Sequence, residues 1–321
     1  MTGQSMSYGK VRRLQRCADD GGRFTMLAAD QRDNLRRALH PDDPESTTAA
    51  ELTEFKVELM RSLSGVASAV LLDPEYGAAQ SVAAGALSGS TGLIVALEAT
   101  GYAESAFDRK SEILRGWSPE KAEALGADAA KLLVYFHQDA PGARAQVELV
   151  TDTAVACADV DLPFIVEPLS FSLTSEPLTS NEKRSVVVET AHMLGGIDGV
   201  DMLKMEFPST PEDEESWEAA CAELDDASSV PWVLLSAGVE FDTFVRQAGV
   251  ACAAGASGVL AGRAVWKESV GMALDERRAF YADTGAERLA RLTQVVETYA
   301  KPWRNLSTDT ADIPPDWFSG G

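Results

Sequence analysis

Residues 199–208 read Gly-Val-Asp-Met-Leu-Lys-Met-Glu-Phe-Pro, a short apolar segment with Lys204 near its end. Its length and its bounding glycine and proline are typical of a buried strand of a parallel sheet. A buried ammonium loses hydration, which lowers the pKa of a lysine, and the neutral amine can form a Schiff base with a carbonyl. We therefore expect a strand here and a nucleophile at Lys204. The alternative is a lysine that extends from a frayed strand end into water.

Seven further segments have the same character, and amphipathic helical stretches separate them. The eight expected strands are residues 24–28, 69–72, 92–97, 130–135, 163–166, 200–205, 232–236 and 258–261. Eight parallel strands, each followed by a helix, indicate a (β/α)8 TIM barrel, an α/β fold.

The helical stretches support this architecture. Residues 51–63 place four large apolar side chains on one stripe, Pro119 suits the first turn of a helix, and residues 241–254 precede the last strand. No linker divides the sequence, so we predict a single barrel domain over 1–321 with extra terminal helices. The barrel itself is expected at about 22–300, followed by an irregular tail at 301–321.

Composition excludes several classes of protein. A formal net charge of -22 disfavours nucleic acid and anionic membrane surfaces as partners. No apolar run reaches the roughly 20 residues of a membrane-spanning helix, and the first ten residues are polar, which predicts a cytoplasmic protein. Its four cysteines and three histidines form no metal-binding pattern, so we expect free thiols, no metal and no cofactor. A homo-oligomer is possible, although no interface can be assigned.

In a TIM barrel the catalytic groups lie at the carboxyl ends of the strands. The polar or glycine residues expected at those ends are Asp30, Gln31, Arg32, Asp73, Glu75, Glu98, Glu167, Lys204, Glu206, Ser236, Gly238, Gly262 and Arg263. These residues are therefore the candidates for the site.

Alternation along the strands selects the central group. Val200, Met202 and Lys204 share one face of their strand, and Glu167 would enter the same pocket from the neighbouring strand. A carboxyl beside an amine suits general acid/base catalysis, although a structural salt bridge is the alternative. Lys131 is a second cation in an apolar strand that can tune the nucleophile or bind substrate oxygen. Asp30 can orient a lysine or bind substrate hydroxyls.

Two loops predict an anion site. Ser236-Ala237-Gly238 and Ala261-Gly262-Arg263 end the seventh and eighth strands, where TIM barrels often bind phosphate through backbone N–H groups. Arg263 would add a planar guanidinium fork for phosphate oxygens. This local basic site would let an acidic protein bind an anionic substrate.

The chain resembles the bacterial class I tagatose-1,6-bisphosphate aldolase family and its relatives that cleave 6-deoxy-6-sulfofructose 1-phosphate. The segments that carry the resemblance are residues 26–32, 71–77, 130–133, 165–168, 203–206, 235–239 and 262–264. It implies a Schiff-base lysine at Lys204, an acid/base at Glu167 and supporting roles for Asp30, Gln31 and Lys131. It also implies phosphate binding by Ser236, Gly238, Gly262 and Arg263, and no metal requirement.

The implied reaction is carbon–carbon bond cleavage of a ketohexose 1-phosphate into dihydroxyacetone phosphate and a three-carbon aldehyde, glyceraldehyde 3-phosphate or sulfolactaldehyde. Residues 71–77 and 92–102 are more similar to the tagatose bisphosphate enzymes, whereas 254–266 is more similar to the enzymes of sulfoglycolysis. The distal anion, phosphate or sulfonate, stays open. So do two alternatives: a non-catalytic phosphosugar sensor on the same barrel, and a Schiff-base aldolase for another sugar phosphate.

Overall fold

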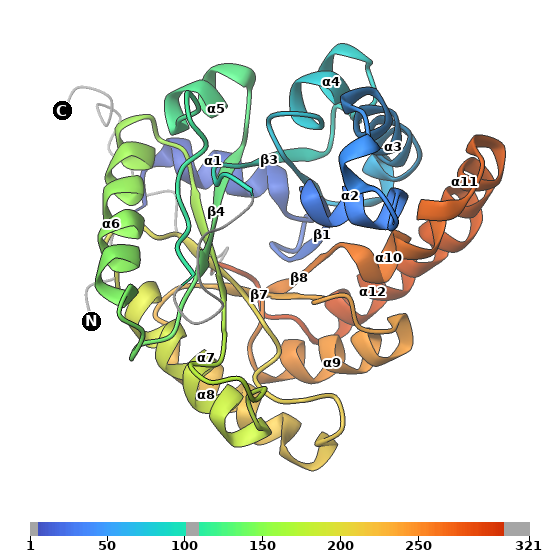
Figure 1. Ribbon diagram of the computed structural model, residues 1–321. Coiled ribbons are helices and arrows are strands. Elements are labelled where there is room, and N and C mark those ends of the chain that lie inside the picture. The colour runs from blue at the N-terminus through green and yellow to red at the C-terminus, as the bar shows by residue number, and fades with distance from the viewer. Residues whose placement is uncertain (1–5, 101–108, 305–321) are drawn as a thin grey trace.

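In the computed structural model, which describes residues 6–100 and 109–304, parallel strands close into a barrel that helices surround (Figure 1). Within that part of the chain there are eight strands, each paired with the next, and β8 pairs with β1. Their bounds are Phe24–Ala29 (β1), Ala69–Leu72 (β2), Gly92–Ala96 (β3), Ala129–Tyr135 (β4), Phe164–Leu169 (β5), Met202–Met205 (β6), Trp232–Leu235 (β7) and Gly258–Ala261 (β8). The predicted TIM barrel is confirmed, with each strand within a few residues of its expected position.

The helices lie outside the barrel and before its first strand. They are Tyr8–Cys17 (α1), Asp33–Leu39 (α2), Ala49–Leu63 (α3), Ala78–Ala83 (α4), Pro119–Leu125 (α5), Ala143–Asp159 (α6), Ser180–Gly195 (α7), Trp217–Ala227 (α8), Phe241–Ala254 (α9), Arg263–Trp266 (α10), Leu274–Phe280 (α11) and Ala286–Tyr299 (α12). The three predicted helices are confirmed as α3, α5 and α9. Thr48 caps α3 through a reciprocal bond pair with Glu51, and Pro119 begins α5.

Alternation along the strands divides the core into two layers. Met26, Ile94 and Met202 belong to the cluster inside the barrel, whereas Leu27 and Leu203 pack outward against the helices. Val200 departs from the prediction, since it packs in the outer cluster. It precedes β6, after a turn at Gly199 with φ of 90°, so the alternation inside the strand does not extend to it.

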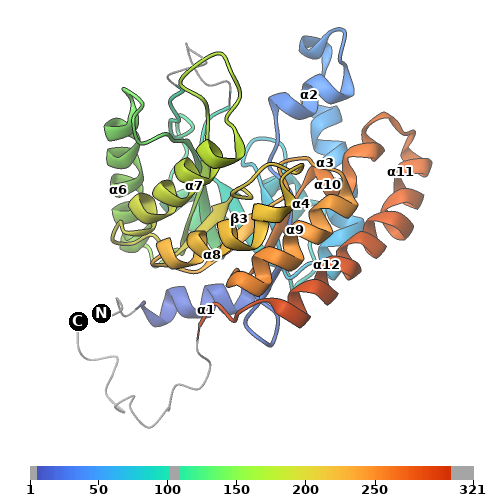
Figure 2. The same ribbon diagram turned by 90° about the horizontal axis from the view of Figure 1, so that it is seen from below.

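Helix α1 covers the end of the barrel at which the strands begin (Figure 2). Lys10 pairs with Asp201, just before β6, at 2.7 Å, and Arg16 pairs with Asp128, just before β4, at 2.9 Å. Trp303 joins the apolar cluster inside the barrel. The carboxyl ends of the strands therefore form the open end of the barrel, where a site can be built.

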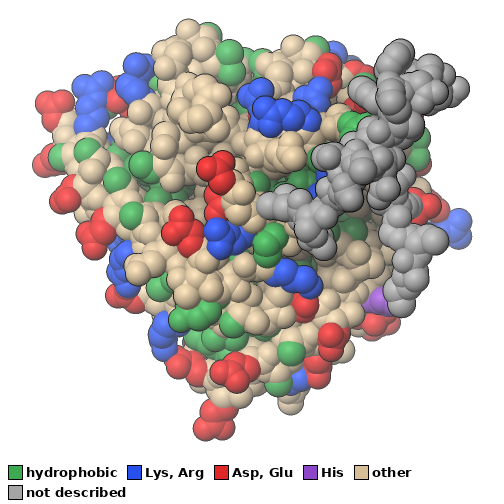
Figure 3. Space-filling view, turned by 180° about the vertical axis from the view of Figure 1, so that it is seen from behind, with side chains coloured by type: hydrophobic (Ala, Val, Ile, Leu, Met, Phe, Trp, Pro, Cys, Tyr) green, Lys and Arg blue, Asp and Glu red, His purple; other side chains and the backbone are tan. Residues whose placement is uncertain are grey.

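Three further observations concern the surface charge, the apolarity of the helices and the tail. On the face shown in Figure 3, acidic and basic side chains are interspersed, so the negative charge does not form one patch there. No helix in the described ranges has the length and apolarity needed to cross a membrane. Residues Lys301–Arg304 are irregular, as predicted, and the rest of the expected tail lies outside the described residues.

Candidate active site

A layer of polar residues follows the apolar interior at the open end of the barrel. Its members lie two residues beyond an inward apolar residue of the same strand, which directs their side chains to the same interior. They are Asp30 after Ala28, Glu98 after Ala96, Lys131 after Ala129, Glu167 after Ile165 and Lys204 after Met202. Gly262, which has no side chain, follows Leu260 at the same position of β8. Strand alternation thus brings together side chains from five strands, four of which, Asp30, Lys131, Glu167 and Lys204, are predicted site residues.

Lys204 and Glu167 lie side by side in this layer. Ile165 pairs in register with Met202, and the two polar residues each lie two positions farther along their strands. Nζ of Lys204 is 2.7 Å from Oε1 of Glu167. The Lys204 residue is only 4% exposed, so it does not extend into water as the alternative interpretation required.

Lys131 is the most enclosed cation of the site. Its side chain is fully buried, and Nζ lies 2.6 Å from Asp30 Oδ2, 2.7 Å from Glu98 Oε1 and 2.8 Å from Glu167 Oε2. Burial by itself lowers the pKa of Lys131, but the three carboxylates reverse this effect and raise that pKa well above its ordinary value. Lys131 is therefore held as an ammonium. Burial raises the pKa of Asp30, but the positive charges of Lys131 and Lys204 outweigh this effect and lower that pKa below its ordinary value.

Glu167 joins the two lysines. One of its oxygens contacts Lys204 and the other contacts Lys131, in an ion pair whose geometry is not that of a hydrogen bond. Lys204 contacts a single carboxylate among the described residues, against three for Lys131. The two lysines of the polar layer thus differ in the number of carboxylates that they contact, and Lys204 contacts fewer.

Sequence reasoning placed Glu98 at a strand end but gave it no role in the site. Glu98 accepts hydrogen bonds from Nζ of Lys131 at 2.7 Å and from the backbone N–H of Leu133 at 3.0 Å. The buried Arg32 donates to the backbone oxygen of Glu98 and to the carboxylate of Glu75. The alternation of Ile94, Ala96 and Glu98 could have identified Glu98 as an inward-facing side chain.

The two predicted phosphate loops meet at the carboxyl ends of β7 and β8. The N–H of Gly262 donates to Oγ of Ser236 at 3.3 Å, and Arg263 donates to the carbonyl of Ala237 at 3.5 Å. Gly238 has φ of 80°, and a Cβ there would lie 3.2 Å from the Arg263 guanidinium carbon. The loops therefore contact each other, with Arg263 beside the backbone of the first.

Besides Glu167 Oε2, which is in an ion pair with Lys131, two buried acceptors of the site have no hydrogen-bond partner among the described residues: Asp30 Oδ1 and Gln31 Oε1. Gln31 lies beside the second loop, since a Cβ on Gly262 would be 3.4 Å from its amide nitrogen. Buried acceptors are normally paired, because a polar atom without a partner is costly to desolvate. These two oxygens suit the hydroxyl groups of a sugar.

Two further strand-end residues, Asp73 and Glu206, form their contacts outside the polar layer. Asp73 forms a fully buried ion pair with Lys56 of α3 and accepts from the N–H groups of Glu75 and Tyr76, so it holds the loop after β2. Glu206 accepts from the N–H and the hydroxyl of Ser170 at 2.6 and 2.7 Å. Neither contacts Lys204 in the described structure.

In the part of the chain that the structure describes, no group of three His, Cys, Asp or Glu side chains is arranged to hold a metal ion. Asp30, Glu98 and Glu167 do converge, but on the ammonium of Lys131. All four cysteines are free, as predicted.

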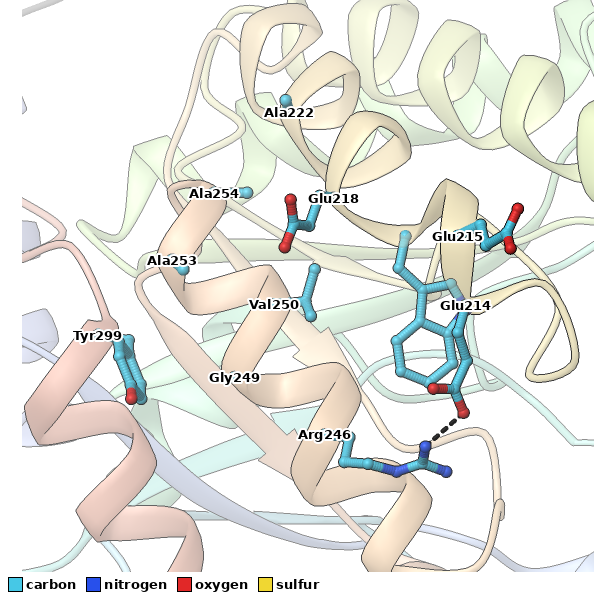
Figure 4. Close-up of a pocket in the computed structure, with 11 residues that line it drawn as sticks. Glu214, Glu215, Glu218, Ala222, Arg246, Gly249, Val250, Ala253, Ala254 and Tyr299 are labelled. Atoms are coloured by element: carbon cyan, nitrogen blue, oxygen red, sulfur yellow. Dashed lines mark hydrogen bonds and ion pairs between the residues drawn. The ribbon is translucent and has the colours of Figure 1, made fainter.

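A separate groove lies between α8 and α9, on the outside of the barrel (Figure 4). Glu214, Glu215 and Glu218 line it, and Arg246 pairs with Glu214 across it. None of the predicted site residues lines this groove. It is therefore distinct from the polar layer of the barrel.

Comparison with known proteins identifies the family of the chain. Residues 24–268 match the family described as DeoC/LacD family aldolase. The chain is 32% identical to tagatose 1,6-diphosphate aldolase 2 of Streptococcus mutans serotype c, over 93% of this chain and 97% of that protein. It is 31% identical to tagatose 1,6-diphosphate aldolase of Streptococcus pneumoniae, over 91% and 96% of the two chains.

Solved structures share the fold at lower identity. An archaeal fructose-1,6-bisphosphate aldolase, with its catalytic lysine bound to the carbinolamine intermediate of the substrate, superposes with a TM-score of 0.58 at 18% identity, covering 89% of this chain and 99% of that chain. The family match extends over most of the chain and includes every residue of the polar layer. The chain therefore belongs to the DeoC/LacD family of aldolases and is a carbon–carbon lyase.

Proposed function

We propose that the protein is a class I aldolase that cleaves a ketohexose 1-phosphate through a Schiff base on Lys204. The observation that carries the proposal is the difference between the two lysines of the polar layer. Lys131 is held by three carboxylates and its pKa is raised, whereas Lys204 contacts only Glu167 among the described residues. The amine with fewer charged partners is the better nucleophile, because losing its proton breaks fewer ion pairs.

In the first half of the cycle, the neutral amine of Lys204 adds to the C2 carbonyl, and a proton passes to the carbonyl oxygen. Loss of water then leaves a protonated imine. Glu167 suits this proton transfer, since its Oε1 lies 2.7 Å from Nζ of Lys204. Lys131 stays charged throughout and stabilises negative charge on the carbinolamine oxygen or on substrate hydroxyls.

In the second half, Glu167 removes the proton of the C4 hydroxyl, and the C3–C4 bond breaks. Its electron pair moves to the imine, which becomes an enamine, and the three-carbon aldehyde leaves. Protonation of the enamine at C3 and hydrolysis of the imine release dihydroxyacetone phosphate and restore the amine. Asp30 and Gln31 would accept hydrogen bonds from the sugar hydroxyls.

The C1 phosphate is assigned to the two loops after β7 and β8. Ser236, Gly238, Gly262 and Arg263 would bind it, with the backbone N–H groups and the guanidinium as donors. The relatives named tagatose 1,6-diphosphate aldolase support a bisphosphate substrate. The 6-deoxy-6-sulfofructose 1-phosphate suggested by residues 254–266 has the same phosphorylated end.

Trapping tests the covalent step. Borohydride reduction with dihydroxyacetone phosphate should add the mass of the reduced adduct to Lys204, located by peptide mass spectrometry. Lys204→Met should remove this adduct although Lys131 is still present. An adduct on Lys131 would reverse the assignment, and no adduct on the folded protein would end the Schiff-base proposal.

Parallel cleavage assays test the substrate. Tagatose 1,6-bisphosphate, fructose 1,6-bisphosphate and 6-deoxy-6-sulfofructose 1-phosphate are supplied separately, and triose phosphate release is measured with a coupling enzyme. The highest kcat/KM identifies the preferred distal group and C4 configuration. Binding of these compounds without any release would favour the sensor instead.

A further inference from the structure

A cationic side chain lies near the mouth of the barrel, away from the loops assigned to the C1 phosphate. The guanidinium carbon of Arg109, in the segment between β3 and α5, is 4.8 Å from the ring centroid of Tyr135. Tyr135 is the last residue of β4, and Arg109 also hydrogen-bonds its hydroxyl. A stacked and hydrogen-bonded arginine is held in place before any ligand arrives.

Strand register shows where the pair of Arg109 and Tyr135 lies along the barrel axis. Tyr135 is on the same face of β4 as Ala129 and Lys131, which both point into the barrel. Leu133 pairs with Glu167 and Tyr135 with Leu169, so Tyr135 lies one layer above the carboxylate assigned to acid/base catalysis. Arg109 is therefore presented above the reacting atoms, toward the open end.

Electrostatics agree with this position. Burial raises the pKa of Tyr135 despite the opposing charge of Arg109, and the carboxylates of Glu167 and Glu206 add to the rise. The phenol is thus within electrostatic reach of the catalytic layer. Glu206 accepts two hydrogen bonds from Ser170, which fix the position of its carboxylate at this rim.

The order of the strands gives a direction to the substrate. In the closed barrel, β4 is opposite β8, and β6 and β5 lie between them on one side. The C1 phosphate is assigned to the loops after β7 and β8, C2 to Lys204 on β6 and the C4 hydroxyl to Glu167 on β5. A chain extended along this path reaches β4 with its C6 end.

We infer that Arg109, positioned by Tyr135, binds the anionic group at C6 of the substrate, a phosphate or a sulfonate. This inference rests on the proposed function, because it takes its direction from the assignments of Lys204 and the phosphate loops. The guanidinium fork donates parallel hydrogen bonds to tetrahedral oxyanions of both kinds. Arg109 is thus a specificity-determining residue for substrates with an anion at both ends.

The test compares substrates with and without the distal anion. Wild type and Arg109→Ala are assayed with tagatose 1,6-bisphosphate, 6-deoxy-6-sulfofructose 1-phosphate and fructose 1-phosphate, which lacks an anion at C6. Of the two substrates with an anionic group at both ends, the relevant one is that with the higher kcat/KM in wild type. For this substrate, R109A should lower kcat/KM about 10- to 100-fold more than for fructose 1-phosphate, as expected for a lost charge-assisted hydrogen bond. Most of the loss should be a rise in KM. Which of the two loses more identifies the natural anion.

Three variants serve as comparisons. Tyr135→Phe keeps the ring under the guanidinium and removes one hydrogen bond, so its selective loss should be smaller than that of R109A. Arg263→Ala should raise KM for all three substrates, because each has a C1 phosphate. Arg144→Ala removes an exposed arginine of α6 that pairs only with Glu148 in the described structure, and should leave all three unchanged.

The outcomes separate the two proposals. Equal losses on all three substrates for R109A, or no loss, would overturn the distal-anion role. If wild type forms no reduced adduct with dihydroxyacetone phosphate, which has no C6 group, the Schiff-base function itself fails. A normal adduct together with unselective R109A kinetics overturns only the role of Arg109.

Discussion

Both ends of the barrel bury a lysine against a carboxylate. They differ in how many lysines share that carboxylate and in which acceptor oxygens have no hydrogen bond. At the closed end, Lys10 of α1 pairs with Asp201, and the same oxygen accepts from the N–H of Phe164 at 2.8 Å. At the open end, Glu167 is shared by two lysines, and Asp30 Oδ1 and Gln31 Oε1 have no hydrogen-bond partner in the described structure.

Burial of a lysine therefore does not by itself indicate a catalytic site. Within the described residues four lysines are buried: Lys10, Lys56, Lys131 and Lys204. Lys10 and Lys56 each tie a helix to a carboxylate beside a strand. Shared carboxylates and unpaired acceptors distinguish the open end, because they leave capacity for a ligand.

The largest expected effect is at the open end. Lys204→Met should lower kcat on the order of 10⁴-fold or more, because the covalent path is lost with the amine. The methionine keeps the volume of the side chain, so circular dichroism and thermal melting should show a folded protein. Substantial residual turnover would mean that another residue forms the intermediate.

A second variant tests the shared carboxylate. Glu167→Gln should lower kcat about 10²- to 10⁴-fold with little change in KM, because the amide keeps the shape but cannot accept or deliver a proton. Glu206→Gln is the matched control, since Glu206 contacts Ser170 rather than Lys204, and it should have a much smaller effect on kcat. Similar losses for both variants would contradict the role of Glu167.

At the closed end the effect should be on stability. Lys10→Met leaves the buried carboxylate of Asp201 without its cation, which should lower the free energy of unfolding by about 3–5 kcal/mol. Asp201→Asn in addition should recover part of the loss, because the amide oxygen can still accept from Phe164 N–H. Urea unfolding gives these values, and kcat of the folded Lys10→Met protein should be unchanged. A fall in kcat comparable to that of Lys204→Met would contradict a purely structural role for Lys10.

The smallest expected signal is alkylation of the buried thiols. Burial raises the pKa of Cys157, Cys221 and Cys252 to about 12, and at the closed end it raises the pKa of Cys17 well above its ordinary value. At pH 8 the native protein should therefore incorporate almost no iodoacetamide, whereas the protein in urea should incorporate one group per cysteine. Mass spectrometry counts the groups. Rapid labelling of Cys17 alone would show that α1 opens, since Cys17 packs against Gly92 at the start of β3.

Much of the fold was accessible from the sequence because each strand is an apolar run of characteristic length between turn residues. The eight strands are predicted in this way, and period-2 alternation predicts that Glu167 and Lys204 share one interior. Val200 was misplaced because the alternation begins only with the strand, and a turn precedes it. Lys10 and Lys56 were not recognised as buried, since they occur in helices whose packing depends on distant segments.

By itself, then, the sequence determined the barrel, the inward face of the strands that contain Glu167 and Lys204, and the polar residues at the strand ends, because these depend on local periodicity. The tertiary structure decided which charges meet: three carboxylates around Lys131, one at Lys204, and Arg109 over Tyr135. The ion pairs join residues that are far apart in the sequence, 33 positions for Glu98 and Lys131. Their distances follow from strand register and barrel closure. A local pattern contains neither the register nor the closure, and together these separate the lysine with one carboxylate partner from the lysine with three.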